Sequence, residues 1–176
     1  MNTVLFAIGM AVGLFAVPAS TPLADPGRGV QILGDERFTP NAIVLATFHF
    51  SPGPLEVRSG EQVTWQNTTA DPHTVSVVRH ADLPATIDQL FACAICTVIG
   101  AAHFPNGFDQ APVPVLDDLK PTGFPPRLDS PGDSFLIGPS GSPGSSITAV
   151  VSAPAGTTLD YMCVIHPWMQ GSIVVR

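Results

Sequence analysis

The sequence has few charged side chains. Only 12% of its 176 residues are Asp, Glu, Lys or Arg, and 7 basic side chains stand against 14 acidic ones, for a formal net charge of -7. Proteins that bind nucleic acid neutralise phosphates with clusters of Lys and Arg. We therefore expect no nucleic-acid partner.

Long stretches without proline or glycine are scarce, because the chain contains 19 prolines and 16 glycines. This composition argues against a helical bundle and favours short strands joined by ordered loops. A hydrophobic fraction of 45% is enough for the core of one domain. The fold class predicted from these features is all-β, with strand-like segments at residues 42–50, 55–58, 62–66, 74–79, 134–137, 146–152, 158–163 and 172–176.

The N-terminus has no Lys or Arg before Arg28, but it has an apolar run from Val4 to Val17. The run is too short to span a bilayer comfortably and has the length of a signal-peptide core, with small residues up to Ala19 suited to cleavage. We predict a signal peptide at 1–19 and export to the periplasm or the extracellular space. An uncleaved N-terminus that anchors the protein to a membrane, or a misassigned start, is the alternative. Residues 20–41 are predicted to form a loosely attached N-terminal extension.

One segment departs from the strand pattern. Apolar residues recur at spacings of three and four between Ile87 and Ala102, which predicts a helix from about Leu83 to about Ala101, capped by Asp82. A proline-rich stretch follows and is predicted to be an ordered surface loop. We therefore expect one domain at 42–176 that carries an insertion at about 80–131.

The chemistry is concentrated near the C-terminus. Cys163, His166 and Met169 follow one another at intervals of three, where a strand turns into a loop and returns as another strand. Thiolate and thioether sulfur suit the cuprous ion, and imidazole also suits the cupric ion. A type 1 copper site needs a second histidine, and His73 is the natural candidate because it lies at the start of the strand-like segment 74–79.

The motifs around these residues resemble the cupredoxin family of small blue copper proteins, which includes plastocyanin, pseudoazurin and amicyanin. The resemblance lies in Gly60-Glu61-Gln62-Val63-Thr64-Trp65-Gln66-Asn67, in Pro72-His73-Thr74-Val75, and in the amicyanin-like spacing of the ligand loop. It covers roughly residues 42–79 and 132–176. It implies a Greek-key β-sandwich, one bound copper ion and single-electron transfer, with the edge of His166 as the exit for the electron. The insertion at about 80–131 departs from the family pattern.

Each ligand has an ordinary explanation when taken alone: a buried Cys, a core Met or a turn His. A structural or zinc-binding sandwich is therefore the main alternative to the copper site. Of the other histidines, His49 is predicted to face solvent because Phe48 and Phe50 take the opposite face of its strand, and His80 receives no role.

Cys93 and Cys96 form a candidate disulfide, as expected for spare cysteines in an exported protein. Residues three apart on a regular helix hold their Cβ atoms about 5–6 Å apart, whereas a disulfide needs roughly 3.5–4.5 Å. Either the helix is distorted there or the pair is free thiols. A metal site of Cys93, Cys96 and His103 is a third option, and haem attachment is excluded because Thr97 follows Cys96.

The predicted function is that of an electron carrier outside the cytoplasm, which is not an enzyme and exchanges single electrons with a protein donor and acceptor that dock near His166. Four protein ligands leave no open position on the metal for a substrate. A copper oxidase or nitrite reductase would need more histidines than the five present, which include no His-x-His pair. A copper-sequestering or copper-delivery protein with the same fold is the alternative.

Overall fold

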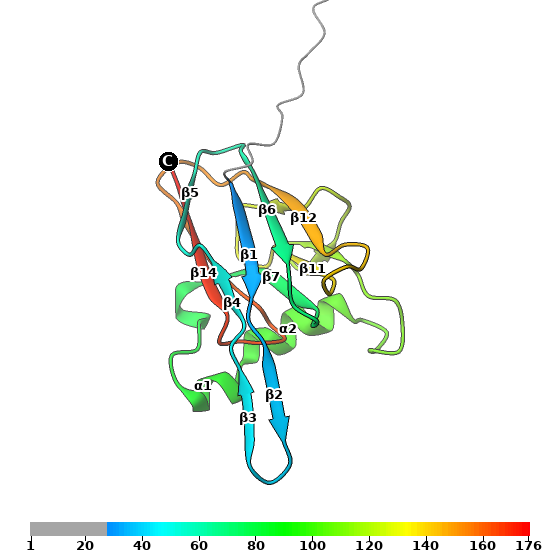
Figure 1. The fold of residues 1–176 in the computed structure, drawn as a ribbon. Coiled ribbons are helices and arrows are strands. Elements are labelled where there is room, and N and C mark those ends of the chain that lie inside the picture. Colours follow the sequence, from blue (N-terminus) through cyan, green and yellow to red (C-terminus); the bar gives the residue numbers. More distant parts are fainter. Residues whose placement is uncertain (1–27) are drawn as a thin grey trace, which may run out of the picture.

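The computed structural model describes residues 28–176, so the predicted signal peptide lies outside the described residues. Two β-sheets pack face to face and confirm the predicted all-β sandwich (Figure 1). The five-stranded sheet has the order β10-β12-β6-β1-β4 and comprises Arg127–Leu128, Ser146–Val151, Gln62–Asn67, Gly29–Leu33 and His49–Ser51. The seven-stranded sheet has the order β5-β14-β13-β7-β11-β8-β9 and comprises Leu55–Val57, Gln170–Val175, Thr158–Met162, His73–Val78, Ser134–Ile137, Val115–Asp117 and Lys120–Pro121.

The chain crosses from one sheet to the other between β4 and β5, β5 and β6, β6 and β7, β9 and β10, β10 and β11, β11 and β12, and β12 and β13. Such crossings are those of a Greek-key sandwich, in which strands that are neighbours in a sheet are distant in sequence. Alternate residues of β6 and β12 are buried, as expected for strands with one face against the core. Trp65, Phe135 and Tyr161 fill the centre of this core with edge-to-face contacts.

The boundary of the domain differs from the predicted one. β1 lies within the predicted N-terminal extension, yet it pairs with β6 on one side and with β4 on the other. Its residues Val30 and Ile32 are fully buried in the core. The domain therefore includes Gly29–Leu33. The sequence of this short segment does not show that it lies between two strands; the pairing in the sheet does.

The predicted strand at 42–50 is divided. Its first part, β3 (Ile43–Ala46), pairs with β2 (Glu36–Thr39) in a separate two-stranded ribbon that projects from one end of the sandwich (Figure 1). Its second part is β4, where Phe48 and Phe50 are buried and His49 is exposed as predicted. The ribbon leaves Phe38 and Val44 more than two-thirds exposed.

The insertion does not contain the single helix predicted from Leu83 to Ala101. It contains a 3₁₀ turn η1 (His80–Asp82) and two helices, α1 (Ile87–Phe91) and α2 (Ala94–His103). Thr86 and Gln89 form a capping box at the start of α1, and Cys93 caps α2, whereas Asp82 pairs with Arg79. Thr86 therefore sets a later start than predicted, and Cys93 divides the predicted helix in two.

The proline-rich stretch is partly built into the sheets. β8 pairs with β11, and β10 pairs with β12, so segments of the predicted loop extend the edges of both sheets. Leu116 of β8 and Ile99 of α2 share a second, smaller core with Val78 and Met162. The insertion is therefore packed on the sandwich through its own apolar cluster.

Among residues 28–176, no helix has the length and apolar character needed to cross a membrane.

Candidate metal centre

The four residues predicted as ligands come from two places in the fold. His73 is the first residue of β7, and Cys163, His166 and Met169 belong to the loop between β13 and β14. β7 and β13 are hydrogen-bonded neighbours, so the start of one strand lies beside the end of the other. Figure 1 shows this loop at the end of the sandwich where α2 lies.

Three donor atoms converge in this place. The Nδ1 atoms of His73 and His166 each lie 3.8 Å from Sγ of Cys163, and they lie 3.0 Å from each other. His73 and Cys163 are buried, and His166 is partly buried. Metal ions bind imidazole nitrogen and thiolate sulfur at roughly 2.0–2.3 Å, and one small ion between these three atoms fits such distances.

The chemistry of the donors fits copper. Two imidazoles and one thiolate form the three strong ligands of a type 1 site, and a methionine completes it as a weak axial ligand. Met169 is 1% exposed and packs in the same core as Cys163. Bound copper would supply a one-electron redox couple at this position.

His73 is held in place by a buried hydrogen-bond network. Its Nε2 atom lies 2.8 Å from the hydroxyl of Thr69, which in turn donates to Oδ1 of Asn67. The amide of Asn67 donates to the carbonyl oxygens of Asp71 and Gly138. This network fixes the ring of His73 and leaves Nδ1 directed at the other two donors.

The sulfur of Cys163 and its loop are also fixed by hydrogen bonds. The backbone amide of Thr74 donates to Sγ at 3.3 Å, and the hydroxyl of Thr74 accepts from the amide of Val164 at 2.8 Å. Within the loop, the amide of Cys163 donates to the carbonyl of Met169, whose own amide donates to the carbonyl of His166. These backbone hydrogen bonds hold the loop in a closed conformation.

Phe48 forms an apolar wall of the site. Its ring centroid lies 5.1 Å from that of His73 and 4.9 Å from that of His166, and the side chain is 3% exposed. Gly34 makes this packing possible: it adopts a φ of +122°, and a Cβ atom there would lie 2.6 Å from the Cα atom of Phe48. A residue with a side chain at this position would displace the wall.

Burial sets the protonation of the ligands in the metal-free protein. It lowers the pKa of His73 to about 4, with a further lowering by the nearby His166. Burial also lowers the pKa of His166, and it raises the pKa of the Cys163 thiol despite hydrogen bonds from Thr74. Both imidazoles are therefore neutral and ready to bind metal, whereas metal binding must release a proton from the thiol.

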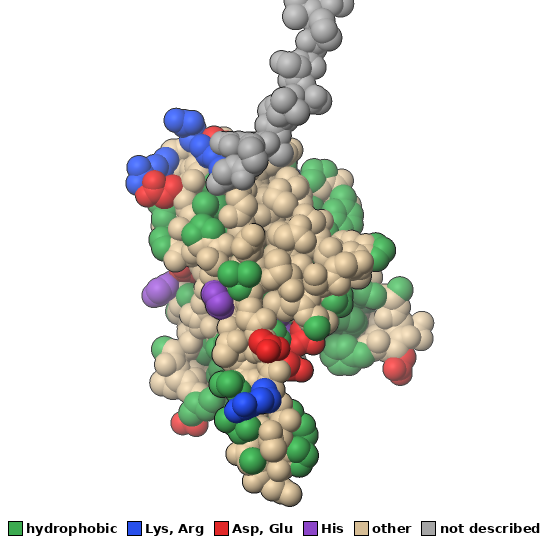
Figure 2. Space-filling model, viewed as in Figure 1, with side chains coloured by type: hydrophobic (Ala, Val, Ile, Leu, Met, Phe, Trp, Pro, Cys, Tyr) green, Lys and Arg blue, Asp and Glu red, His purple; other side chains and the backbone are tan. Residues whose placement is uncertain are grey.

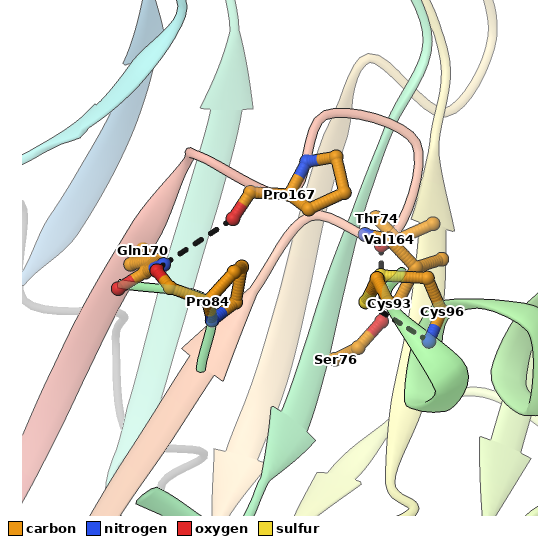
Figure 3. Close-up of a disulfide and its surroundings, with 8 residues drawn as sticks. All are labelled: Thr74, Ser76, Pro84, Cys93, Cys96, Val164, Pro167 and Gln170. Carbon is orange, nitrogen blue, oxygen red and sulfur yellow. Dashed lines mark hydrogen bonds between the residues drawn. A yellow bond between two sulfur atoms is a disulfide. The ribbon is translucent and has the colours of Figure 1, made fainter. Parts of the chain in front are cut away.

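A disulfide joins Cys93 and Cys96, whose Cα atoms are 5.3 Å apart. The bridge is compatible with the helix because Cys93 lies outside it as the capping residue of α2. Figure 3 shows the bridge beside Val164 and Thr74, and Cys93, Cys96 and Val164 pack in the same apolar cluster. His103, the third member of the alternative metal site, instead hydrogen-bonds to Val113 and Ser134.

The remaining histidines lie outside the site. His49 and His80 are exposed, and His80 pairs with Asp160. In the described part of the chain, only one other cluster has metal-ligating groups, formed by Asp117, Asp118 and Asp133, and it contains no histidine. The carboxylate of Asp133 accepts hydrogen bonds there from the backbone amides of Asp118, Asp129 and Ser130.

The hydrogen bonds of Thr69 and Thr74 to the predicted ligands His73 and Cys163 were not predicted from the sequence. Thr74 stands beside His73 in the motif that carries the family resemblance, so its position was a usable signal. His103 and Ser134 carried no such signal, because they meet only when α2 packs on β11.

Comparison with known proteins gives structural matches only. No protein-family model matches the sequence, and no curated protein matches it. One similar solved structure is a purple cupredoxin from Nitrosopumilus maritimus, with 17% identity, 85% of this chain and 99% of that chain covered, and a TM-score of 0.42. Another is a plastocyanin variant from a fern, with 21% identity, 84% and 99% covered, and a TM-score of 0.40. A third is amicyanin from Paracoccus versutus, with 12% identity, 88% and 86% covered, and a TM-score of 0.37.

All three matched proteins belong to the family that the sequence motifs resemble. At this level of likeness the donor atoms of the chain itself, and not the matches, point to copper. The site is a buried His-Cys-His cluster with an adjacent methionine, and its donor set fits a type 1 copper ion.

Proposed function

We propose that the protein is a single-electron carrier that works outside the cytoplasm and holds one type 1 copper ion through His73, Cys163, His166 and Met169. The observation that carries this proposal is the convergence of Sγ of Cys163 with the Nδ1 atoms of His73 and His166 in a buried site. The thioether of Met169 is assigned as the weak axial ligand.

The supporting hydrogen bonds favour electron transfer. A redox centre exchanges electrons quickly when its ligands move little between oxidation states, because less of the surroundings must reorganise. Thr69 holds the ring of His73, and the amide of Thr74 holds the sulfur of Cys163. Both contacts restrict the movement of a predicted ligand.

The path for the electron and the docking surface are assigned to the loop. His166 is the only histidine of the site that is not fully buried, and its ring lies 5.2 Å from that of Trp168. Trp168 is 39% exposed and Ile165 is 42% exposed, so the loop that carries His166 presents two apolar side chains to solvent. In Figure 2, hydrophobic side chains lie along the β2–β3 ribbon, and acidic and basic side chains lie at the base of the ribbon. We assign a protein donor and a protein acceptor to this apolar end.

An enzymatic role is less well supported. An oxidase or a nitrite reductase needs a second copper with an open position, and no second cluster among residues 28–176 includes a histidine. Copper delivery is the remaining alternative. It predicts ready release of the metal, whereas buried and hydrogen-bonded ligands predict retention.

The absorption spectrum of the oxidised, copper-loaded protein tests the metal assignment. We expect an intense visible band from the thiolate of Cys163, and Cys163→Ser should abolish it. The double variant Cys93→Ser/Cys96→Ser is the matched control, because it removes the other two cysteines and should keep the band. Persistence of the band in Cys163→Ser would refute the assignment.

Two further measurements address the role and the location. Rapid electron self-exchange with retention of copper against a chelator supports the carrier, and slow exchange with rapid loss of copper supports delivery. The N-terminal residue of the protein recovered from outside the cytoplasm tests export. We expect a mature chain that begins at Ser20, and a chain that still begins at Met1 would contradict cleavage.

A further inference from the structure

A cavity of about 520 Å³ lies between helix α2 and the loop that carries Cys163, outside the predicted metal centre. It reaches from Thr74 and His103, which are at most 1% exposed, to Phe108, which is 83% exposed. The cavity therefore opens to solvent at one end and enters the interior of the protein at the other. Its volume lies within the range of about 300–1,000 Å³ that is typical of sites for small molecules.

The lining of the cavity carries no charge. It contains no Asp, Glu, Lys or Arg, and burial lowers the pKa of His103, so that the ring is neutral. Both ring nitrogens of His103 and the hydroxyl of Thr74 already have hydrogen-bond partners within the protein. A charged molecule would lose its hydration here without gaining a partner, so the cavity favours an uncharged one.

Aromatic and aliphatic side chains line the rest of the cavity. The rings of Phe104 and Phe108 have centroids 4.7 Å apart and are tilted by 40°. Val164 and Ile165 belong to the lining from the ligand loop, and Figure 3 shows Val164 beside Cys96. Aromatic rings pack favourably against other rings in stacked or edge-to-face arrangements, so this lining suits an aromatic molecule.

Gly100 keeps the cavity open on the side of α2. It lies inside this helix, where glycine lowers stability relative to alanine. A Cβ atom at Gly100 would meet no atom within 4 Å outside the backbone of α2 itself. Packing against the rest of the chain therefore does not require glycine at this position, whereas an open cavity does.

We propose that this cavity is a binding site for a small, uncharged aromatic molecule of one or two rings. The bound molecule would contact Thr74 and Val164, which directly follow His73 and Cys163, but none of the four predicted metal ligands lines the cavity. Binding therefore does not require copper. Most of the lining comes from the insertion at about 80–131, so the proposal also gives this segment a function.

Calorimetric titration of the protein with 2-naphthol and with 2-naphthoate tests the chemistry of the site. The two compounds have the same fused rings, but at neutral pH the first is uncharged and the second carries a carboxylate. We expect one molecule of 2-naphthol to bind per chain with a dissociation constant of about 1 mM or lower, and 2-naphthoate to bind about tenfold more weakly or not at all. Equal binding of both compounds, or no binding of 2-naphthol, would overturn the proposal.

The variant Gly100→Leu tests the location of the site. Its side chain would extend into the cavity, and leucine favours a helix, so the variant should fold and bind 2-naphthol at least about tenfold more weakly. Gly123→Leu is the matched control, because a Cβ atom there also meets no atom within 4 Å and Gly123 does not line the cavity. Unchanged binding by Gly100→Leu, or an equal loss in both variants, would contradict the assigned location.

NMR spectra of the wild-type protein give a second measurement that needs no variant. In the metal-free protein, 2-naphthol should shift the amide signals of Gly100 and Val164 and leave the signal of Gly123 unchanged. Shifts confined to residues away from α2 and the ligand loop would place the probe elsewhere and overturn the proposal. Because this measurement uses the metal-free protein, a failure of the proposed copper site would not change its outcome.

Discussion

The backbone amide of Thr74 donates a hydrogen bond to Sγ of Cys163, although the two residues are 89 positions apart in the sequence. Thr74 directly follows the ligand His73 on β7, and Cys163 directly follows β13. The antiparallel pairing of β7 with β13 brings these positions together. One strand pair therefore sets both the position of a histidine ligand and the environment of the thiolate.

Replacement of Met169 tests its assignment as the axial ligand. We expect Met169→Leu, which keeps the volume of the side chain, to retain the visible thiolate band and to raise the reduction potential, because the cupric ion loses a weak donor. Absorption spectroscopy and voltammetry measure the two effects. Met162→Leu is the control, since Met162 is equally buried but packs in the cluster beneath α2. A potential that does not change in Met169→Leu would contradict axial ligation.

Removal of the disulfide should lower stability without removing copper. A bridge that closes so short a loop lowers the conformational entropy of the unfolded chain, which raises the free energy of unfolding by about 2 kcal/mol. Urea unfolding of Cys93→Ser/Cys96→Ser should show a loss of about this size relative to the wild-type protein, with the visible band retained. An equal loss of stability when reductant is added to the wild-type protein would show that the bridge itself is responsible. No loss in either experiment would contradict a structural role for the bridge.

The metal-free protein should become less stable as the pH falls from about 6.5 toward 4. Because burial lowers the pKa of His73 to about 4, the unfolded chain takes up a proton before the folded chain does. A tenfold change in proton affinity corresponds to about 1.4 kcal/mol, so His73 alone accounts for a loss of about 3 kcal/mol across this interval. The pKa values of His103 and His166 are lowered too, and their effects have the same sign.

Urea unfolding at a series of pH values measures this dependence. His73→Asn should reduce the change in unfolding free energy between pH 6.5 and 4, because it removes one of the histidines whose pKa is lowered by burial. Above pH 6.5 the histidines are neutral in both states, so they contribute no further change. Constant stability from pH 7 to pH 4 would contradict the burial of a neutral His73.

A charge beside the exposed edge of His166 should slow electron exchange. Ile165→Lys places an ammonium group on the apolar surface of the loop, where two molecules would have to approach each other. We expect slower self-exchange at low salt, with the reduction potential nearly unchanged, as measured by NMR line broadening and voltammetry. Phe124→Lys is the control, because it adds the same charge at an exposed apolar residue of the proline-rich stretch. Equal slowing by both variants would indicate an effect of net charge and not of the docking surface.

The sequence alone determined the class of fold and predicted the candidate donor set. Cys163, His166 and Met169 lie within seven residues, so their spacing indicates a metal-binding loop without a structure. In β6 every second residue, Val63, Trp65 and Asn67, is buried, because successive side chains of a strand face opposite sides of the sheet. This pattern also depends only on neighbouring residues. Local patterns of this kind persist in the folded protein.

Only the tertiary structure decided how distant segments are used. The short strand β1 lies inside the sheet because it pairs with β6 on one side and with β4 on the other. The predicted single helix is divided at Cys93, which lies outside α2 and forms a disulfide with Cys96. Hydrogen bonds from His103 to Ser134, from Ser134 to Ser76 and from Ser76 to Thr74 join α2, β11 and β7, although these elements are far apart in the sequence. Hydrogen bonds depend on the positions of atoms in space. The candidate ligands could therefore be predicted from their spacing in the chain, whereas the contacts that orient them required the fold.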